Sequence, residues 1–572
     1  MTMPQAIRTP YDKVAQTLAV ETGSHGGEVA VPVLMRLTDR ALSDCALVDD
    51  LWTRAIRNTE APRYHAFSPD LDRAMRIMSD HGGPLNAAEA DFVGRVIVYL
   101  ICPTADVDVD AVLAKFLGAM TLIDGHQQAP LLEALWIGPM VVFAPDGTAS
   151  HEPADGMRMT LDEGTDAPVV GIIDDGIGYL NAAFRAPGQD RTRIDALWQM
   201  HRPRRYANGI DLGLDPLMGD DIDARIGQLR AGQTTETQVY YDDNLRLYAH
   251  DSYRGTNRAV THGTHMLDLI CQQFRPSFKT AQRDILAVQL PPFSIRDTSG
   301  DHLSFFAYVG LRLMLWRMRD GLGSGVGPDE GLRPLVLNVS LGMLAGPKDG
   351  SGHFQREFER EVAAYEAATG GTVAAFFAYG NAYGDRQLAT ATVASQKDVA
   401  FKWRNLPEDH TASFMEIRAT GPVELGLIAP GEAAPHHWVA PGMGQTIALK
   451  GVHGDDLGWA LGHGSARYDE AGSLVWDEDG VVMALRPTSP DLGDAAFRAG
   501  LWTVVVRSVC DEDVEITAQI QSGSTPPGYA PHGRQSYFES PQTDDAVTVT
   551  DAGSYTALAP HSGGAIKTVA AA

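Results

Sequence analysis

The sequence has few cysteines and lacks long apolar runs. Only four cysteines occur in 572 residues, and no two of them form a Cys-x-x-Cys pair. This argues against a disulfide framework and against a zinc knuckle. The longest apolar stretches, such as 92–102 and 135–144, are shorter than the roughly 20 residues that cross a bilayer. The first 20 residues also lack the apolar segment of a secretory signal, so we expect a cytoplasmic protein with no transmembrane span.

Positive charge is scarce as well. Lys and Arg number 46 against 73 Asp and Glu, which gives a formal net charge of −27. Such a charge repels phosphate backbones and anionic lipid headgroups, so nucleic acid and membrane surfaces are excluded as expected partners. Hydrophobic residues make up 44% of the chain, as in ordinary globular proteins. A chain of this length is expected to fold into several domains.

The residues from 167 to 401 show the alternation typical of an α/β fold. Short, almost continuously apolar runs alternate with longer helical patterns, which indicates a parallel sheet with helices on both faces. We expect a buried helix, a surface helix that ends at Gly370, and a third helix with an apolar stripe formed by Met266, Leu269, Ile270 and Phe274. The expected strands are 169–173, 285–290, 335–339 and 373–378, and the first two helices are 305–318 and 354–365.

The rest of the chain is expected to form additional units. Residues 1–166 read as a mixed α/β pro-region or accessory domain, with a strand at 29–37 and helices at 71–79 and 87–99. Residues 402–521 read as a β-sandwich-like insert, with a hairpin over 474–483 that turns at Asp479-Gly480. Its tryptophans, Trp459, Trp476 and Trp502, form either a recognition surface for protein or carbohydrate or part of the core. Residues 522–572 are expected to be a linker and a return to the α/β unit.

Two short motifs carry titratable side chains. Ile172-Ile173-Asp174-Asp175-Gly176 places an acid at the carboxyl end of a buried strand, where ligands bind in open α/β sheets, although a simple turn acid has the same pattern. His262 and His265 open a helix three residues apart. No carboxylate or cysteine lies at a suitable local spacing to complete a zinc site, so they are either catalytic or packed histidines.

Two further motifs end apolar strands in small polar residues. Ser340-Leu341-Gly342 offers backbone groups that could pair with an extended peptide. Asn381 offers a side-chain amide that could donate to an oxyanion or cap a turn. Taken singly, each motif has a structural reading.

Taken together and in this order, the four motifs resemble those of the subtilisin-like serine protease family. The resemblance covers about residues 168–381 and implies a subtilisin-like α/β fold and hydrolysis of peptide bonds in protein or peptide substrates. Asp174 would orient the histidine, His262 would be the general base, and Asn381 would be the oxyanion donor. Ser340, Leu341 and Gly342 would bind the substrate strand. The resemblance implies no catalytic cofactor.

The chain departs from the family in three places. None of Ser522, Ser524, Ser536, Ser540, Ser554 and Ser562 is followed by the small-residue helix start of the nucleophile motif, so the nucleophile is not identified. The last residues are similar to the strand that precedes the nucleophile in relatives, so we expect a C-terminally truncated protease. The alternative is an inactive peptide-binding or regulatory protein on the same scaffold.

The other two departures lie close to the motif acid. Asp175 replaces the usual Ser or Thr, and it would either raise the pKa of its neighbours or face solvent. Residues 181–253 are expected to be an insertion near the cleft. Within it, Asp220, Asp221 and Asp223 form either a structural calcium site or a solvated loop.

Overall fold

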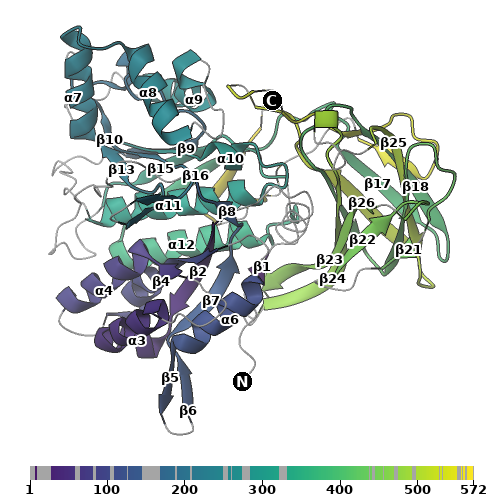
Figure 1. Cartoon of the computed structure of the whole chain (residues 1–572), viewed down its shortest axis with the longest axis horizontal. Helices are drawn as coiled ribbons and strands as arrows, with labels where there is room; N and C mark the ends of the chain where they lie inside the picture. Colours follow the sequence, from purple (N-terminus) through teal and green to yellow (C-terminus); the bar gives the residue numbers. More distant parts are fainter. Residues whose placement is uncertain are drawn as a thin grey trace.

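The computed structural model shows a mixed α/β chain with several sheets (Figure 1). No helix in the described part of the chain is long and apolar enough to cross a membrane. The structure describes residues 7–8, 28–57, 65–81, 85–103, 108–124, 127–144, 168–186, 190–206, 209–248, 255–258, 261–273, 284–320, 332–344, 346–436, 438–440, 445–454, 456–468, 474–491, 498–526, 528–530, 532–550, 556, 558–560 and 563–570.

A parallel sheet organises the middle of the chain. Its order is β13-β10-β14-β9-β15-β16-β29, and every neighbouring pair is parallel except β10 with β13. Four of these strands lie where the apolar runs predicted them. The strands are β9 Val169–Asp174, β10 Ile194–Gln199, β13 Pro216–Met218, β14 Ile285–Gln289, β15 Leu335–Val339, β16 Val373–Ala378 and β29 Ile566–Val569.

The strand β10 corrects the prediction that residues 181–253 are an insertion. It lies inside the main sheet because its side chains are almost all buried between β13 and β14. The sequence signal was weak because β10 carries a charged residue, Asp195, which pairs with Arg317 of α11 instead of with solvent. The smaller elements of this stretch are η1 Ala182–Phe184, β11 Arg204–Tyr206, β12 Gly209–Asp211, α7 Gly219–Arg230, α8 Glu236–Tyr248 and η2 Thr256–Arg258.

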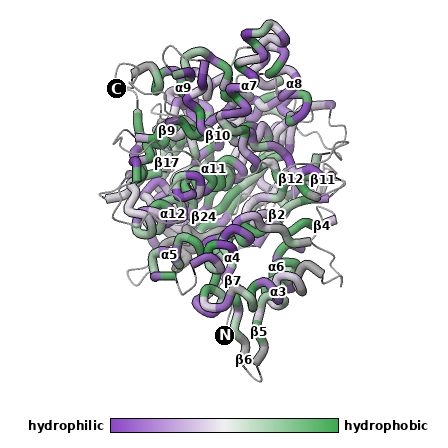
Figure 2. The backbone as a smooth tube through the Cα atoms, turned by 90° about the vertical axis from the view of Figure 1, so that its left-hand side faces the viewer, coloured by the Kyte–Doolittle hydropathy of each residue, from purple (hydrophilic) through white to green (hydrophobic). Residues whose placement is uncertain are grey.

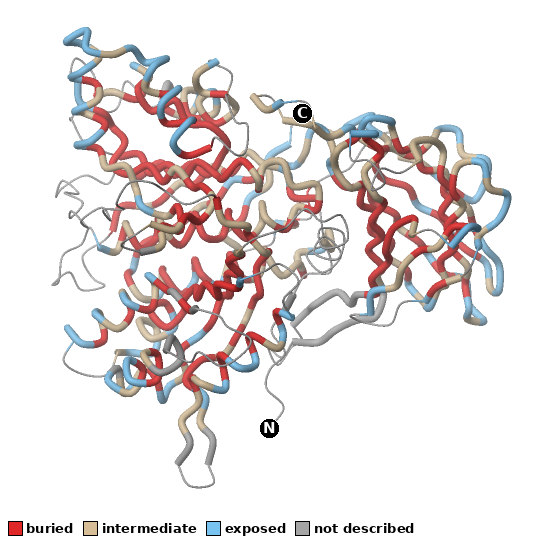
Figure 3. The backbone as a smooth tube through the Cα atoms, viewed as in Figure 1, coloured by how far each residue is buried: buried red, intermediate tan, exposed pale blue. Residues whose placement is uncertain are grey.

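Helices lie on both faces of the main sheet (Figure 1). The helices α7, α8 and α9 His262–Gln273 lie on one side, and α11 Asp301–Asp320 and α12 His353–Thr369 lie on the other. A short helix, α10 Pro292–Ile295, precedes α11. The side chains of β9 alternate between the two cores: Val170 and Ile172 pack with the α9 side, and Val169 and Ile173 with the α11 side. The red backbone of Figure 3 follows this buried sheet.

Among the residues that the structure describes, the face on the α9 side is buried over only part of its width. Over β14 and β9 its residues, such as Ile285 and Ile172, are fully buried. In register with Ile172, the same face continues to Asn338 of β15 and Phe376 of β16, and Phe376 is 36% exposed. Val569 of β29 is 56% exposed. We call the side chains of this face on β15, β16 and β29 the open half-face.

The N-terminal part forms a second sheet of order β1-β7-β2-β4-β3, with β8 paired to β2. The strand at 29–37 is β2, as predicted, whereas the helix predicted over 87–99 ends at Val93 and is followed by β4. The change occurs at Gly94, where the chain turns into a fully buried strand. The elements are β1 Ile7–Arg8, β2 Val29–Leu37, α2 Asp39–Leu42, α3 Cys45–Arg57, β3 His65–Phe67, α4 Pro69–His81, α5 Ala87–Val93, β4 Arg95–Cys102, α6 Val109–Ala119, β5 Thr121–Asp124, β6 Gln127–Pro130, β7 Leu132–Ile137 and β8 Val141–Val142.

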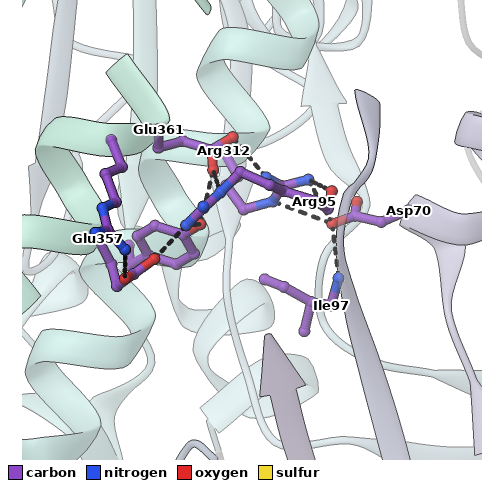
Figure 4. Close-up of polar contacts among 8 residues, drawn as sticks. Asp70, Arg95, Ile97, Arg312, Glu357 and Glu361 are labelled. Carbon is purple, nitrogen blue, oxygen red and sulfur yellow. Dashed lines mark hydrogen bonds and ion pairs between the residues drawn. The ribbon is translucent and has the colours of Figure 1, made fainter. Parts of the chain in front are cut away.

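This N-terminal unit packs on α11 and α12 through a buried charged cluster (Figure 4). Arg95 of β4 forms ion pairs with Glu357 and Glu361 of α12. Arg312 of α11 pairs with Glu361 at 2.5 Å and with Asp70 at 3.2 Å. Each arginine pairs with carboxylates of other elements, so the cluster joins four elements: β4, α4, α11 and α12.

The helix α12 therefore does not lie on the surface, as its charged residues had predicted. Glu357 and Glu361 are buried because the N-terminal unit covers them and supplies their arginine partners. Gly370 ends the helix with a φ of 72°, as expected from the sequence.

The third unit is a two-sheet β-sandwich with its own core. Its strands begin at Leu388 and end at Val549, so they extend beyond both ends of the predicted insert at 402–521. The predicted linker region contributes β27 and β28 to the two sheets. One sheet contains β17 Leu388–Val393, β19 Ser413–Ala419, β22 Thr446–Lys450, β23 Asp456–Tyr468, β24 Leu474–Leu485, β26 Val514–Ile520 and β28 Val547–Val549; the other contains β18 Asp398–Asn405, β20 Val423–Ile428, β21 Trp438–Val439, β25 Gly500–Ser508 and β27 Tyr537–Phe538.

One prediction within the sandwich is wrong, and for the tryptophans one of the two alternatives, the core, is confirmed where the structure describes them. The strand β24 runs through Asp479-Gly480 without turning: Gly480 pairs with His463 of β23 and Arg418 of β19, and the register with β23 shifts at this point. Trp459 and Trp502 are buried and pack in cores, so they do not form a recognition surface. The side chain of Trp476 lies outside the described residues. In Figure 2 purple (hydrophilic) residues are frequent along α7 and α8 at the top of the view, whereas green (hydrophobic) residues are frequent around β9 and β10.

Candidate active site

The site is built where the carboxyl end of β9 meets the start of α9. Asp174 is the last residue of β9 and is fully buried, and His262 is the first residue of α9. Nδ1 of His262 lies 2.7 Å from Oδ1 of Asp174. The two residues are 88 positions apart in the chain, so only the tertiary fold joins them. The contact predicted from the motifs is present.

Gly263 makes this contact possible. A Cβ atom at this position would lie 2.0 Å from the carbonyl oxygen of Asp175, a distance that no side chain can adopt. Thr264 joins the start of α9 to the turn after β9. Its backbone N–H donates to the carbonyl of Gly176 at 3.1 Å, and its Oγ1 accepts from the N–H of Gly178 at 2.7 Å. The order His-Gly-Thr therefore sets the approach of the helix to the strand.

The electrostatics of the pair favour a proton on Nδ1. The hydrogen bond to Asp174 raises the pKa of His262, although partial burial opposes this. Burial raises the pKa of Asp174, and the hydrogen bond from His262 counteracts the rise. Because a carboxylate only accepts, Nδ1 donates to it and the lone pair of Nε2 stays available. The imidazole is 38% exposed, so this nitrogen can be reached from solvent.

Asp175 lies directly behind the pair and does not face solvent, which was one of its two readings. It is 3% exposed, and its Oδ1 accepts hydrogen bonds from the N–H of Gly176 at 2.8 Å and from the hydroxyl of Tyr529 at 2.8 Å. Burial raises the pKa of Asp175 to about 7, and the neighbouring Asp174 adds to the rise. Two adjacent buried carboxyl groups therefore differ in their partners.

Sequence reasoning missed two residues of this corner. Gln289 ends β14 beside Asp174, and its Oε1 accepts the N–H of Ile177 at 2.8 Å. Its Nε2 donates to the hydroxyl of Tyr248 at 2.7 Å. The available signal was a polar residue that ends an apolar strand, the same pattern that singled out Asp174.

The predicted substrate and oxyanion residues lie on neighbouring strands at the same edge of the sheet. Ser340, Leu341 and Gly342 follow β15, and Ser340 Oγ donates to Asn338 at 2.9 Å. Asn381 follows β16 and is exposed, and its amide makes no hydrogen bond within the described part of the chain. The carboxyl ends of parallel strands share one edge, so these residues lie on the same side of the sheet as Asp174.

The remaining predicted residues do not join the site. No serine among the described residues is hydrogen-bonded to His262, and Ser554 and Ser562 lie outside the described residues. Asp220, Asp221 and Asp223 lie on α7, where Asp221 accepts the N–H of Met218 and Asp223 that of Thr192. The described ranges hold no cluster of three or more His, Cys, Asp or Glu side chains that could bind a metal ion.

Comparisons with known proteins add little at this site. No family model matches the sequence, and no curated protein matches it. A similar solved structure is the CspB protease of Clostridium perfringens, with 14% identity and a TM-score of 0.39. The match covers 66% of this chain and 65% of that chain, so this chain spans less than two thirds of that protein.

Proposed function

We propose that the chain is a subtilisin-like serine endopeptidase in which Asp174 and His262 are the acid and the general base. The observation that carries the proposal is the 2.7 Å hydrogen bond between a fully buried carboxylate and a partly exposed imidazole at the carboxyl edge of a parallel sheet. A serine hydroxyl is a weak nucleophile at neutral pH, and such a pair removes its proton as it attacks.

The neighbouring strand ends support the rest of the chemistry. In the proposed mechanism the backbone of Ser340 to Gly342 pairs with an extended peptide, and Gly342 leaves open space where a side chain would stand. The exposed amide of Asn381 donates to the oxyanion that forms when the carbonyl is attacked. His262 then returns its proton to the leaving amine.

The nucleophile is proposed to lie on a helix that follows β29. The strand β29 runs parallel to β16, so its carboxyl end reaches the same edge as Asp174. A helix that begins there would cover the open half-face, where Phe376 and Val569 are exposed. Its first turn would stand at the sheet edge shared with His262, which is the position that an attacking hydroxyl requires.

The test is hydrolysis of casein by the product of the whole reading frame, including any codons after 572. We expect hydrolysis by the parent protein and loss of at least about 10³-fold in His262→Ala, the order seen when a triad member is removed. His265→Ala is the matched control, because His265 is an exposed histidine on the same helix. Equal activity of the parent and His262→Ala would refute the role of His262.

The second candidate is a peptide-binding or regulatory protein on an inactive protease scaffold. It is favoured by one observation: within the described residues, no serine contacts His262. This candidate predicts peptide binding without cleavage. Covalent labelling of a serine by a fluorophosphonate probe, lost in His262→Ala, would exclude it.

A further inference from the structure

A tyrosine from the connection between β26 and β27 of the β-sandwich contacts the acid next to the candidate catalytic pair. Tyr529 lies after β26, the strand that crosses the sandwich at 514–520. Its hydroxyl donates to Oδ1 of Asp175 at 2.8 Å, across 354 positions of the chain. The same oxygen accepts the N–H of Gly176, so Tyr529 is bonded to the turn that directly follows Asp174.

The turn is also held from a second direction. The ring of Tyr529 packs against Leu247 and Tyr248 at the end of α8. Tyr248 in turn accepts from Gln289, whose other amide atom holds the N–H of Ile177. Three separate parts of the chain thus converge on residues 175–177: α8, β14 and the connection between β26 and β27 of the sandwich.

We infer that Tyr529 and Asp175 are positioning residues that couple the docking of the β-sandwich to the orientation and charge of the Asp174–His262 pair. The importance of this coupling for catalysis rests on the proposed peptidase function, but the coupling itself does not. The sandwich also touches the α/β unit elsewhere, since Thr298 donates to the carbonyl of Ala412 at 2.9 Å. Tyr529 is the contact that reaches the site.

The coupling has an electrostatic part because Asp175 is close enough to influence His262. The titratable groups that face Asp175 are Asp174 on β9, His262 on α9, Tyr248 on α8 and Tyr529. The negative charge of Asp175 raises the pKa of His262. Removing that charge, or removing the hydroxyl that stabilises it, should therefore lower the pKa of His262.

The test is an NMR titration of the His262 imidazole in the full chain, which needs no hydrolysis. We expect the pKa of His262 to fall most in Asp174→Asn, less in Asp175→Asn and least in Tyr529→Phe. In Asp175→Asn the side-chain oxygen can still accept the hydrogen bond from Tyr529, so the turn keeps its hydrogen bonds while the negative charge of Asp175 is lost. In Tyr529→Phe the acid loses a donor, is more protonated near neutral pH, and supports the imidazolium less.

The matched control is Tyr537→Phe, which removes a tyrosine hydroxyl from β27 of the sandwich. It should leave the titration of His262 unchanged. The inference is overturned if Asp175→Asn and Tyr529→Phe both titrate like the parent while Asp174→Asn shifts. A failed peptidase assay with shifted titrations would instead refute only the proposed function. Thermal unfolding verifies that each variant is folded. If Asp175→Asn does not fold, the titration of His262 in Tyr529→Phe alone decides the inference.

Discussion

The two faces of the parallel sheet are covered to different extents. On the α11 side, helices and the N-terminal unit seal the whole width, and even charged side chains there are buried in ion pairs. On the α9 side, cover extends over β10, β14 and β9 and stops at β15. In β16 the alternation is direct: Phe377 on the sealed face is 1% exposed and Phe376 on the open half-face is 36% exposed. The open half-face therefore combines exposed apolar side chains, Phe376 and Val569, with the exposed Lys567 that is in register with Phe376.

The largest effect should come from breaking the sealed face at its charged cluster. Arg312→Leu leaves Glu361 and Asp70 without this partner in a buried site, and we expect a loss of about 3–5 kcal/mol in the free energy of unfolding. Urea denaturation measures it. Arg36→Leu, which breaks an ion pair with Glu133 whose members are 50% and 29% exposed, should cost at most about 1 kcal/mol. Equal costs would mean that the interface is not sealed.

The covered and open halves of the α9 side can be compared residue by residue. Ile285→Ala removes a fully buried side chain from the covered half and should cost about 2–5 kcal/mol. Phe376→Ala on the open half-face should cost about 1 kcal/mol, because no helix packs on it in the described chain. The difference between the unfolding free energies lost in Ile285→Ala and in Phe376→Ala should be smaller in a protein that includes the proposed helix after β29. Similar costs without that helix would contradict the comparison.

A pH-dependent effect should distinguish the buried acid at the site. The pKa of Asp175 is about 7 in the folded chain and near 3.8 in the unfolded chain, so the folded chain binds the proton of Asp175 more tightly. The contribution of protonated Asp175 to the free energy of unfolding is fully present below about pH 4 and is lost as the pH rises through about 7. Asp175→Asn should therefore be more stable than the parent at pH 8 and equal to it near pH 4. Unfolding curves at both pH values measure this, and an unchanged difference across the range would contradict it.

The smallest effect is expected at a histidine of the sealed face. His353 lies against the ring of Trp136, and its two ring nitrogens are enclosed without a partner among the described residues. Burial lowers the pKa of His353 to about 4. The contribution of neutral His353 to the free energy of unfolding is present above about pH 6.5 and is lost as the pH falls through about 4. His353→Phe should flatten this acid slope and gain about 1 kcal/mol at pH 7, as measured by thermal unfolding. A steeper slope in the variant would show that protonation of His353 is not the cause.

Local sequence patterns predicted the helices and strands whose burial follows from their own residues. The strands β9 and β14 were predictable because their apolar runs are buried on both faces, and β15 and β16 because their apolar runs are buried on one face; α12 ended at Gly370 as expected. The predictions failed where a distant part of the chain supplies the environment. Asp195 in β10 obscured a central strand because its partner, Arg317, is 122 positions away. Glu357 and Glu361 indicated a surface helix because the arginine that pairs with both, Arg95, is 262 and 266 positions away.

The sequence by itself determined the strand ends that carry Asp174, Ser340 and Asn381, and the glycine that lets the helix of His262 approach. These features depend on residue type and short spacing, which local sterics and burial dictate. Only the tertiary structure decided that Asp174 and His262 touch, that Asp175 is buried under Tyr529, and that Phe376 and Val569 on one sheet face are exposed among the residues the structure describes. Those depend on which segments meet, and burial energy and hydrogen bonding between distant segments are not encoded in any short pattern.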